Sequence, residues 1–430
     1  MTGLGLKADA YAGLESPAAR QGAPKPARGN GNFWSAGHRP TLFASLLYFD
    51  LAFMVWVLLG PLAPEIAKDL GLNPAEKGLM VALPALAGAV LRLFVGLIVD
   101  RVGPKRTGAV AQVVVIVGLV AAWAIGVHSF AATIALGVLL GVAGASFAVA
   151  LPLASRWYPP EHQGKALGIA GMGNSGTVLA ALFAPTLATV VGWNGVFGLA
   201  AIPLAIVFVA YMLMARDAPG RPQARSFAAW LEPLKTGDAW WFMLFYGVTF
   251  GGFSGLAASL SIYFTDRFDL STVTAGYCTA ACVFVGSLVR PLGGALADRV
   301  GGIRTLSVVY AVAAAALVAI GSGPAGVAAA LGLFLIAMLA LGAGNGAVFQ
   351  LVPQRFGDQI GAMTGLVGMA GGIGGFYLAS SLGFARQVTG SYQSGFLIFA
   401  ALALVALVAL TAVKRRWRTD WRLAAQGVRI

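Results

Sequence analysis

Two stretches of this sequence match each other at a constant offset of 198 residues. Residues 91–106 read LRLFVGLIVDRVGPKR, and residues 289–304 read VRPLGGALADRVGGIR. The copies share an arginine within apolar sequence, a glycine, the run Asp-Arg-Val-Gly and a final arginine. A weaker echo follows each copy, GKALGIAGMGNSG at 164–176 and GAMTGLVGMAGGIG at 361–374. Repeats of this length predict two structurally related halves.

The composition around these copies is that of a membrane protein. Of the 430 residues, 58% are apolar and only 10% are charged, whereas soluble proteins carry roughly 25% charged residues. A bilayer-spanning helix needs about 20 mostly apolar residues. Twelve such runs are present, near 41–64, 77–99, 107–127, 130–153, 165–190, 195–215, 239–264, 273–297, 303–321, 325–350, 361–385 and 393–413.

These runs predict an all-α membrane protein of twelve transmembrane helices in two pseudo-symmetric bundles. The predicted parts are a disordered tail (1–40), a first six-helix bundle (41–215), a linker (216–238), a second six-helix bundle (239–413) and a basic tail (414–430). The first 40 residues lack the apolar core of a cleavable signal peptide.

The net charge of +13 could suggest a nucleic-acid partner, but the basic residues follow the predicted topology instead. With both termini in the cytoplasm, 23 of the 29 Lys and Arg residues lie in the tails and internal loops, and four lie in external loops. An excess of basic residues on the cytoplasmic side is the known orientation rule. The lipid bilayer, and not nucleic acid, is therefore the expected surroundings.

The remaining two basic residues, Arg92 and Arg290, lie inside apolar runs. Each precedes the aspartate of its copy, Asp100 or Asp298, by eight residues, which is about 12 Å along a helix and thus near the middle of a ~30 Å core. Ionisable residues at that depth are costly and mark functional sites. A planar guanidinium pairs with planar oxyanions through parallel hydrogen bonds. The alternative is that carboxylates neutralise both arginines, but only Asp50 lies well inside a run.

The loop GLIVDRVGPKR at 96–106 resembles the conserved loop of the major facilitator superfamily. In that superfamily the charges of this loop form a latch between helices. The resemblance implies a latch formed by Asp100, Arg101 and Arg106 in the first copy and by Asp298, Arg299 and Arg304 in the second.

The glycine-rich runs resemble the signatures of the nitrate/nitrite porter family within this superfamily. Glycines spaced in this way usually let helices pack closely, and packing or gating is expected of Gly168, Gly171, Gly173, Gly176, Gly365, Gly368, Gly371 and Gly372. Packing does not explain Asn174, an amide within an apolar helix. The resemblance implies that Arg92, Arg290, Asn174 and Tyr246 bind the anion, with Phe53, Phe147 and Phe250 around it.

We therefore expect a monomeric bacterial inner-membrane transporter of nitrate, and of nitrite, working by alternating access. Proton-coupled nitrate uptake is favoured narrowly, with Asp50 as the proton site, and nitrate/nitrite exchange is the alternative. Asp50 could instead pair with an arginine or cap the first helix. Another cargo, such as a carboxylate or a drug, and a transporter-like sensor also remain open. An enzyme does not fit, because the three histidines lie in tails or loops, and a channel would leave the twofold repeat and the latch loops without a purpose. The sequence implies no metal or cofactor.

Overall fold

The computed structural model describes residues 33–219, 226–356 and 359–420, and the statements below concern those residues. Most of the predicted N-terminal tail, part of the linker and the last ten residues of the C-terminal tail lie outside them. The predicted domain boundaries therefore stay predictions.

All regular structure in the described part of the chain is helical. The first half contains η2 (Phe33–Ser35), α1 (Arg39–Trp56), α2 (Leu59–Asp69), α3 (Pro74–Val102), α4 (Pro104–Ile125), α5 (Phe130–Gly144), α6 (Phe147–Ser155), α7 (Pro160–Gly171), η3 (Met172–Ser175) and α8 (Gly176–Met214). The linker contains α9 (Phe227–Trp230) and η4 (Glu232–Lys235). The second half contains α10 (Gly237–Phe268), α11 (Thr272–Val300), α12 (Gly302–Gly321), α13 (Val327–Arg355), α14 (Ile360–Thr389) and α15 (Gln393–Asp420).

Eleven segments of the described chain are long and apolar enough to cross a membrane. One of them, Lys165–Met214, covers two of the predicted runs. Within it the backbone of Gly192 is non-helical, with φ 71° and ψ 158°, a conformation that glycine adopts without steric cost. The eleven segments are thus consistent with the twelve predicted runs, and the predicted fold is confirmed.

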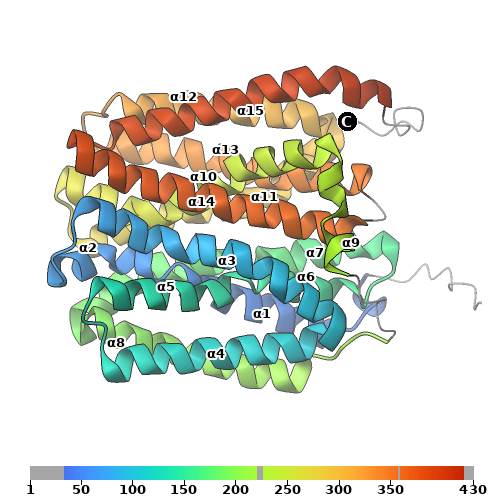
Figure 1. The fold of residues 1–430 in the computed structure, drawn as a ribbon, viewed down its shortest axis with the longest axis horizontal. Coiled ribbons are helices and arrows are strands. Elements are labelled where there is room, and N and C mark those ends of the chain that lie inside the picture. Colours follow the sequence, from blue (N-terminus) through green and yellow to red (C-terminus); the bar gives the residue numbers. More distant parts are fainter. Residues whose placement is uncertain (1–32, 220–225, 357–358, 421–430) are drawn as a thin grey trace, which may run out of the picture.

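The helices lie side by side in two groups, α1 to α8 and α10 to α15 (Figure 1). Contacts between the groups run through α3 with α14, α8 with α11, and α2 with α10. We call the end of the bundle where α1 begins and α15 ends the terminal end, and the opposite end, where α2 ends and α3 begins, the distal end (Figure 1). Both loops with the repeated Asp-Arg-Val-Gly run lie at the terminal end.

Three predicted spans of the first half are interrupted, whereas α10 to α15 are continuous in the described residues. The first breaks between α1 and α2, the fourth between α5 and α6, and the fifth at η3. Pro61 explains the first break, because a proline has no N–H to donate to the carbonyl four residues earlier. That carbonyl, of Val57, accepts instead from the N–H of Gly60 at 2.9 Å. Glycine, which disfavours helix, borders the other two breaks.

The distal end of the bundle is closed by direct contacts between the two halves. A Cβ added at Gly78 of α3 would lie 2.7 Å from Cα of Gly383 in α14, so these helices touch backbone to backbone. Nζ of Lys77 pairs with a carboxylate oxygen of Asp266 at 3.1 Å. Nearby, Thr272 donates to Glu65 at 2.9 Å.

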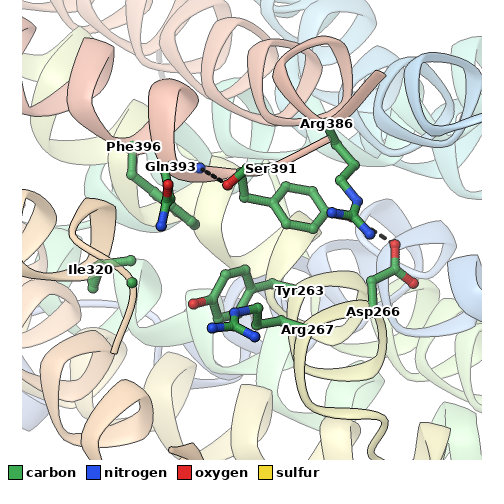
Figure 2. Close-up of a pocket in the computed structure, with 10 residues that line it drawn as sticks. Tyr263, Asp266, Arg267, Ile320, Arg386, Ser391, Gln393 and Phe396 are labelled. Atoms are coloured by element: carbon green, nitrogen blue, oxygen red, sulfur yellow. Dashed lines mark hydrogen bonds between the residues drawn. The ribbon is translucent and has the colours of Figure 1, made fainter. Parts of the chain in front are cut away.

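Asp266 also borders a small cavity at this end (Figure 2). The hydroxyl of Tyr392 donates to Asp266 at 2.7 Å, and Arg267 and Arg386 line the same cavity. Its volume of about 30 Å³ is that of one water molecule. The cavity is therefore too small for a cargo larger than water.

Candidate anion-binding site

Arg92 lies at the interface between the two halves and is only 2% exposed. Its Nε donates to the carbonyl of Gly144 in α5 at 3.0 Å, and its Nη1 donates to the carbonyl of Gly368 in α14 at 2.7 Å. Its Nη2 is buried and has no hydrogen-bond partner among the described residues. The guanidinium is therefore fixed on two sides, with one nitrogen left to donate elsewhere.

The break between α5 and α6 makes the Gly144 carbonyl available. In a continuous helix this oxygen would accept from the N–H of Ala148. That N–H donates instead to Ala145 at 2.9 Å, and the N–H of Val149 donates to Ser146 at 3.0 Å. The fourth span is thus interrupted at the residue that orients Arg92, as is common where discontinuous membrane helices form binding sites.

Three aromatic rings surround the Arg92 guanidinium. Its Cζ lies 5.6 Å from the ring centre of Trp56, 5.5 Å from that of Phe147 and 5.7 Å from that of Phe250. An aromatic face attracts a cation within about 6 Å, more strongly when water is excluded. Rings partly stabilise the charge without neutralising it, so a positive potential remains at the site.

Arg290 has a looser environment in α11. Its Nη2 donates to the hydroxyl of Tyr246 at 3.4 Å, and its Cζ lies 5.6 Å from the ring centre of Phe349. Its Nη1 is buried without a hydrogen-bond partner among the described residues. Both arginines thus retain a buried nitrogen that can donate to a ligand.

A continuous set of rings joins the two arginines. Phe147, beside Arg92, lies 6.2 Å from Phe349, beside Arg290. On the other side, Phe250 stacks on Tyr246 at 5.2 Å, and Tyr246 meets Phe349 edge-on at 4.9 Å. The structure therefore brings the two repeat-matched arginines into one site enclosed by aromatic rings.

No carboxylate in the described part of the chain neutralises these arginines. The ion pairs found there are Lys77–Asp266, Arg156–Asp100 and Arg355–Asp238. The carboxylate of Asp50, the candidate partner in the sequence, accepts a hydrogen bond from Ser175 at 2.7 Å. Two uncompensated guanidinium groups with buried donors suit a small anion.

Asn174 lies in η3, the one-turn interruption of the fifth span. It is 3% exposed, and its Oδ1 is buried with no hydrogen-bond partner among the described residues. This turn packs against α1 and against α11, the helix that carries Arg290. A buried amide oxygen without a partner is unfavourable, and such groups occur where a ligand or a moving element completes the bonding.

Of the three phenylalanines predicted from the sequence, Phe147 and Phe250 face the Arg92 guanidinium. Phe53 is not one of the three rings around Arg92. Its ring centre lies 4.6 Å from that of Trp56 and 4.3 Å from that of Phe49. Trp56 and Phe349 were not identified from the sequence, although both face a guanidinium. One sequence signal for Phe349 exists, since Gly-Ala-Val-Phe at 346–349 parallels Gly-Ala-Ser-Phe at 144–147.

The signature glycines fall into two groups by what a Cβ would meet. At Gly371 it would lie 2.8 Å from the rings of Tyr246 and Phe250, whereas at Gly368 the nearest atom, Nη1 of Arg92, is 3.6 Å away. Close neighbours also face Gly173 (Phe49, 2.5 Å), Gly176 (backbone of Asp50, 1.7 Å), Gly365 (Trp230, 2.3 Å) and Gly372 (Ala89, 2.7 Å), but no atom lies within 4 Å at Gly168 or Gly171.

The two latch loops differ although their sequences match. In the first, Nη2 of Arg156 pairs with Asp100 at 2.8 Å. The corresponding Arg355 pairs with Asp238 at 2.5 Å, and Asp298 is exposed. The other latch candidates, Arg101, Arg106, Arg299 and Arg304, are also exposed.

Comparison with known proteins agrees with this fold and site. A family model described as Major Facilitator Superfamily matches residues 44–379, and the chain belongs to that superfamily of membrane transporters. Within it, the chain belongs with the relatives named as nitrate or nitrite transporters. It is therefore a transporter and not an enzyme.

Three relatives illustrate this group. The chain is 36% identical over 367 residues to the probable nitrate/nitrite transporter NarK2 of Mycobacterium tuberculosis H37Rv, covering 82% of this chain and 91% of that one. It is 32% identical to the nitrite extrusion protein of Bacillus subtilis (83% and 89%) and 30% identical to the probable nitrate/nitrite antiporter NarK1 of Thermus thermophilus (85% and 89%).

A solved structure supports the fold alone. A bacterial homolog of the human lysosomal transporter Spinster, inward-facing and unoccupied, matches with a TM-score of 0.68 at 18% identity, over 91% of this chain and 99% of that one.

Proposed function

We propose that this protein moves nitrate and nitrite across the membrane by alternating access, with the anion held between Arg92 and Arg290. The observation that carries this proposal is a pair of guanidinium groups, one from each half, that each have a buried nitrogen without a hydrogen-bond partner and no carboxylate partner among the described residues. The names of the relatives support the same cargo. The ring cage favours an ion of few atoms over a drug-sized molecule.

The direct test is binding and counterflow with purified protein. Titration calorimetry with nitrate, nitrite, chloride and acetate measures which anion binds. Counterflow of labelled nitrate in proteoliposomes separates a transporter from a sensor, because a sensor binds nitrate without moving the label. Acetate binding at least as tight as nitrate binding would instead support a carboxylate transporter.

For the coupling mode we propose exchange of nitrate for nitrite. Two like charges facing each other oppose closure of an empty site, and a bound anion offsets that repulsion. An anion-loaded carrier therefore reorients more readily than an empty one. The carboxylate of Asp50 accepts from Ser175 and forms no ion pair with an arginine among the described residues, which favours exchange over the symport that the sequence suggested.

Nitrate/proton symport is the second candidate, because Asp50 contacts Ser175, the neighbour of Asn174. Through this contact, protonation of Asp50 would act on the fifth span at the anion site. The two modes are separated in proteoliposomes without internal anion. Nitrate accumulation driven by an inward acid gradient, lost in Asp50→Asn while exchange survives, establishes symport. Accumulation driven only by internal nitrite establishes exchange.

For the location we propose a bacterial inner membrane, with both termini in the cytoplasm. The concentration of basic residues in the tails and in the loops of the terminal end supports this orientation. The terminal end is then the cytoplasmic one. A cysteine introduced at the exposed Val102, in a chain carrying Cys278→Ala and Cys282→Ala, should react with a membrane-impermeant thiol reagent in inverted vesicles but not in intact cells.

A further inference from the structure

Trp230, at the end of the linker helix α9, inserts its indole between the two halves. The side chain is only 6% exposed, although it belongs to a short segment outside both bundles. A Cβ added at Gly96 of α3 would lie 2.9 Å from the ring, and one at Gly365 of α14 would lie 2.3 Å from it. The indole thus packs directly on two glycine backbones, one from each half.

The indole also makes a polar contact at the first latch loop. Its Nε1 donates a long hydrogen bond of 3.4 Å to one carboxylate oxygen of Asp100. The other oxygen of Asp100 accepts from Arg156 at 2.8 Å. Trp230 is therefore held at a defined depth next to a charged pair of the first half.

Nearer the distal end, α3 and α14 contact each other directly, without an inserted side chain. Gly78 of α3 touches Gly383 of α14, and further along a Cβ at Gly372 would lie 2.7 Å from Ala89. Beyond Arg92 the indole fills the space between α3 and α14. At the start of α14, a Cβ added at Gly361 would meet no atom within 4 Å.

We propose that Trp230 is a wedge that holds the terminal ends of α3 and α14 apart. Alternating access, on which this inference rests, requires the terminal end to close when the distal end opens. Packed interfaces switch between discrete arrangements, and α3 and α14 cannot close over a buried indole. The wedge therefore stabilises the state in which the terminal end is open and the distal end closed (the terminal-open state). The indole must leave the space between α3 and α14 before the carrier can reorient. The linker then sets how readily the empty carrier turns over.

The wedge is tested by distances between spin labels on opposite halves, measured without nitrate. A terminal pair is placed at Val102 and Ile360, and a distal pair at Ile125 and Val388, all of them exposed. Cysteines replace these residues in a chain carrying Cys278→Ala and Cys282→Ala. Double electron–electron resonance then reports the populations of the two states.

Trp230→Ala should shift the ratio of terminal-open to terminal-closed molecules about tenfold or more toward closed, because a buried tryptophan contributes substantial packing. The terminal pair should shorten while the distal pair lengthens. Trp240→Ala is the matched control, since Trp240 lies nearby in α10 but is 57% exposed, and it should leave both distances unchanged. Unchanged distances in Trp230→Ala, or a shorter terminal pair without a longer distal pair, would overturn the wedge.

Two further variants make the result specific. Gly365→Ala should displace the indole, and in the background of Trp230→Ala it should add nothing, because coupled sites are non-additive. An equal effect in both backgrounds would contradict the ring contact. Trp230→Phe keeps a ring without the N–H and should resemble the wild type, and Trp230→Leu serves if the alanine variant does not fold.

The outcome is independent of the cargo. A shift in Trp230→Ala together with no nitrate counterflow in the wild type supports the wedge and contradicts the nitrate proposal. Nitrate counterflow together with unchanged distances does the reverse.

Discussion

At the scale of the residue, the two arginines of the site are held in different ways. Arg92 is bound by two carbonyl oxygens from opposite halves and surrounded by three rings. Arg290 contacts one phenol hydroxyl and one ring. We therefore propose that Arg92 contributes to the assembly of the site as well as to anion binding, while Arg290 is freer to follow the anion.

Replacement of either arginine tests planar recognition. Arg92→Ala and Arg290→Ala should abolish nitrate binding. The lysine variants should bind at least tenfold more weakly, because an ammonium lacks the planar fork and a hydrogen bond to a charged group contributes about 1.5–3 kcal/mol. Titration calorimetry measures the affinity. Near wild-type nitrate binding by Arg92→Lys would show that planar recognition is wrong.

Asn174 should orient the anion and not supply charge. Loss of one hydrogen bond to a charged group costs about 1.5–3 kcal/mol, so Asn174→Ala should weaken nitrate binding by about 10- to 150-fold. Insertion and the melting temperature without nitrate should stay close to those of the wild type. An unchanged affinity in the folded variant would leave Asn174 as a helix-packing residue.

At the scale of the element, the glycines of α14 have distinct tasks. Gly368 supplies a carbonyl to Arg92, which any residue can do, whereas Gly371 leaves room for two site rings. The helices of the first half show the complementary device. There, a break after Gly144 frees the carbonyl that accepts from Arg92, and a one-turn interruption carries Asn174, whose Oδ1 has no hydrogen-bond partner among the described residues.

Alanine at the two positions of α14 separates these tasks. Gly371→Ala would place a Cβ 2.8 Å from the rings of Tyr246 and Phe250. Overpacking costs about 1–3 kcal/mol, so nitrate affinity should fall by about 5- to 150-fold. Gly368→Ala meets its nearest atom at 3.6 Å and should stay within about twofold of the wild type. Equal affinities of the two variants would contradict this assignment.

The sequence predicted the features that depend on residue type and on position along the chain. Arg92 and Arg290 stand out because charge is rare in apolar runs, and the repeat places them at matched positions. Trp56 was missed because an aromatic residue in an apolar run is indistinguishable from ordinary packing, and Phe349 because its only signal is the short parallel between residues 346–349 and 144–147. The carbonyl acceptors and the helix breaks leave no hydropathy signal. The depth of Asp50 is readable from its position, but its bond to Ser175 depends on how α1 and η3 pack.

At the scale of the whole molecule, the two ends of the bundle are closed to different extents. At the distal end the halves are joined by a backbone contact and an ion pair, and the hydroxyl of Tyr392 donates to the aspartate of that pair. At the terminal end an indole from the linker stands between them. Opening of the distal end must break the Lys77–Asp266 pair, the only ion pair between the halves in the described residues.

Asp266→Asn should therefore favour the distal-open state. The pair is partly buried, with side-chain exposures of 15% and 21%, and a pair of this kind contributes about 1 kcal/mol or somewhat more, so the ratio of states should change by about fivefold. The distal spin-label pair measures it. Asp269→Asn is the control, with the same charge change at an exposed residue whose φ of 53° asparagine tolerates. Equal distances in both variants would leave the ion pair without a gating role.

The uncompensated charge of the site also has an electrical consequence. A carrier that crosses with one anion and returns empty moves one net charge per cycle, which amounts to about 2.3 kcal/mol per 100 mV of membrane potential. A one-for-one swap of nitrate for nitrite moves none. Potassium diffusion potentials imposed with valinomycin should therefore leave nitrate/nitrite exchange unchanged, and a clear dependence on voltage would contradict one-for-one exchange. Exchange of one nitrate for one nitrite would thus bring an anion into a cell that is negative inside without work against the membrane potential.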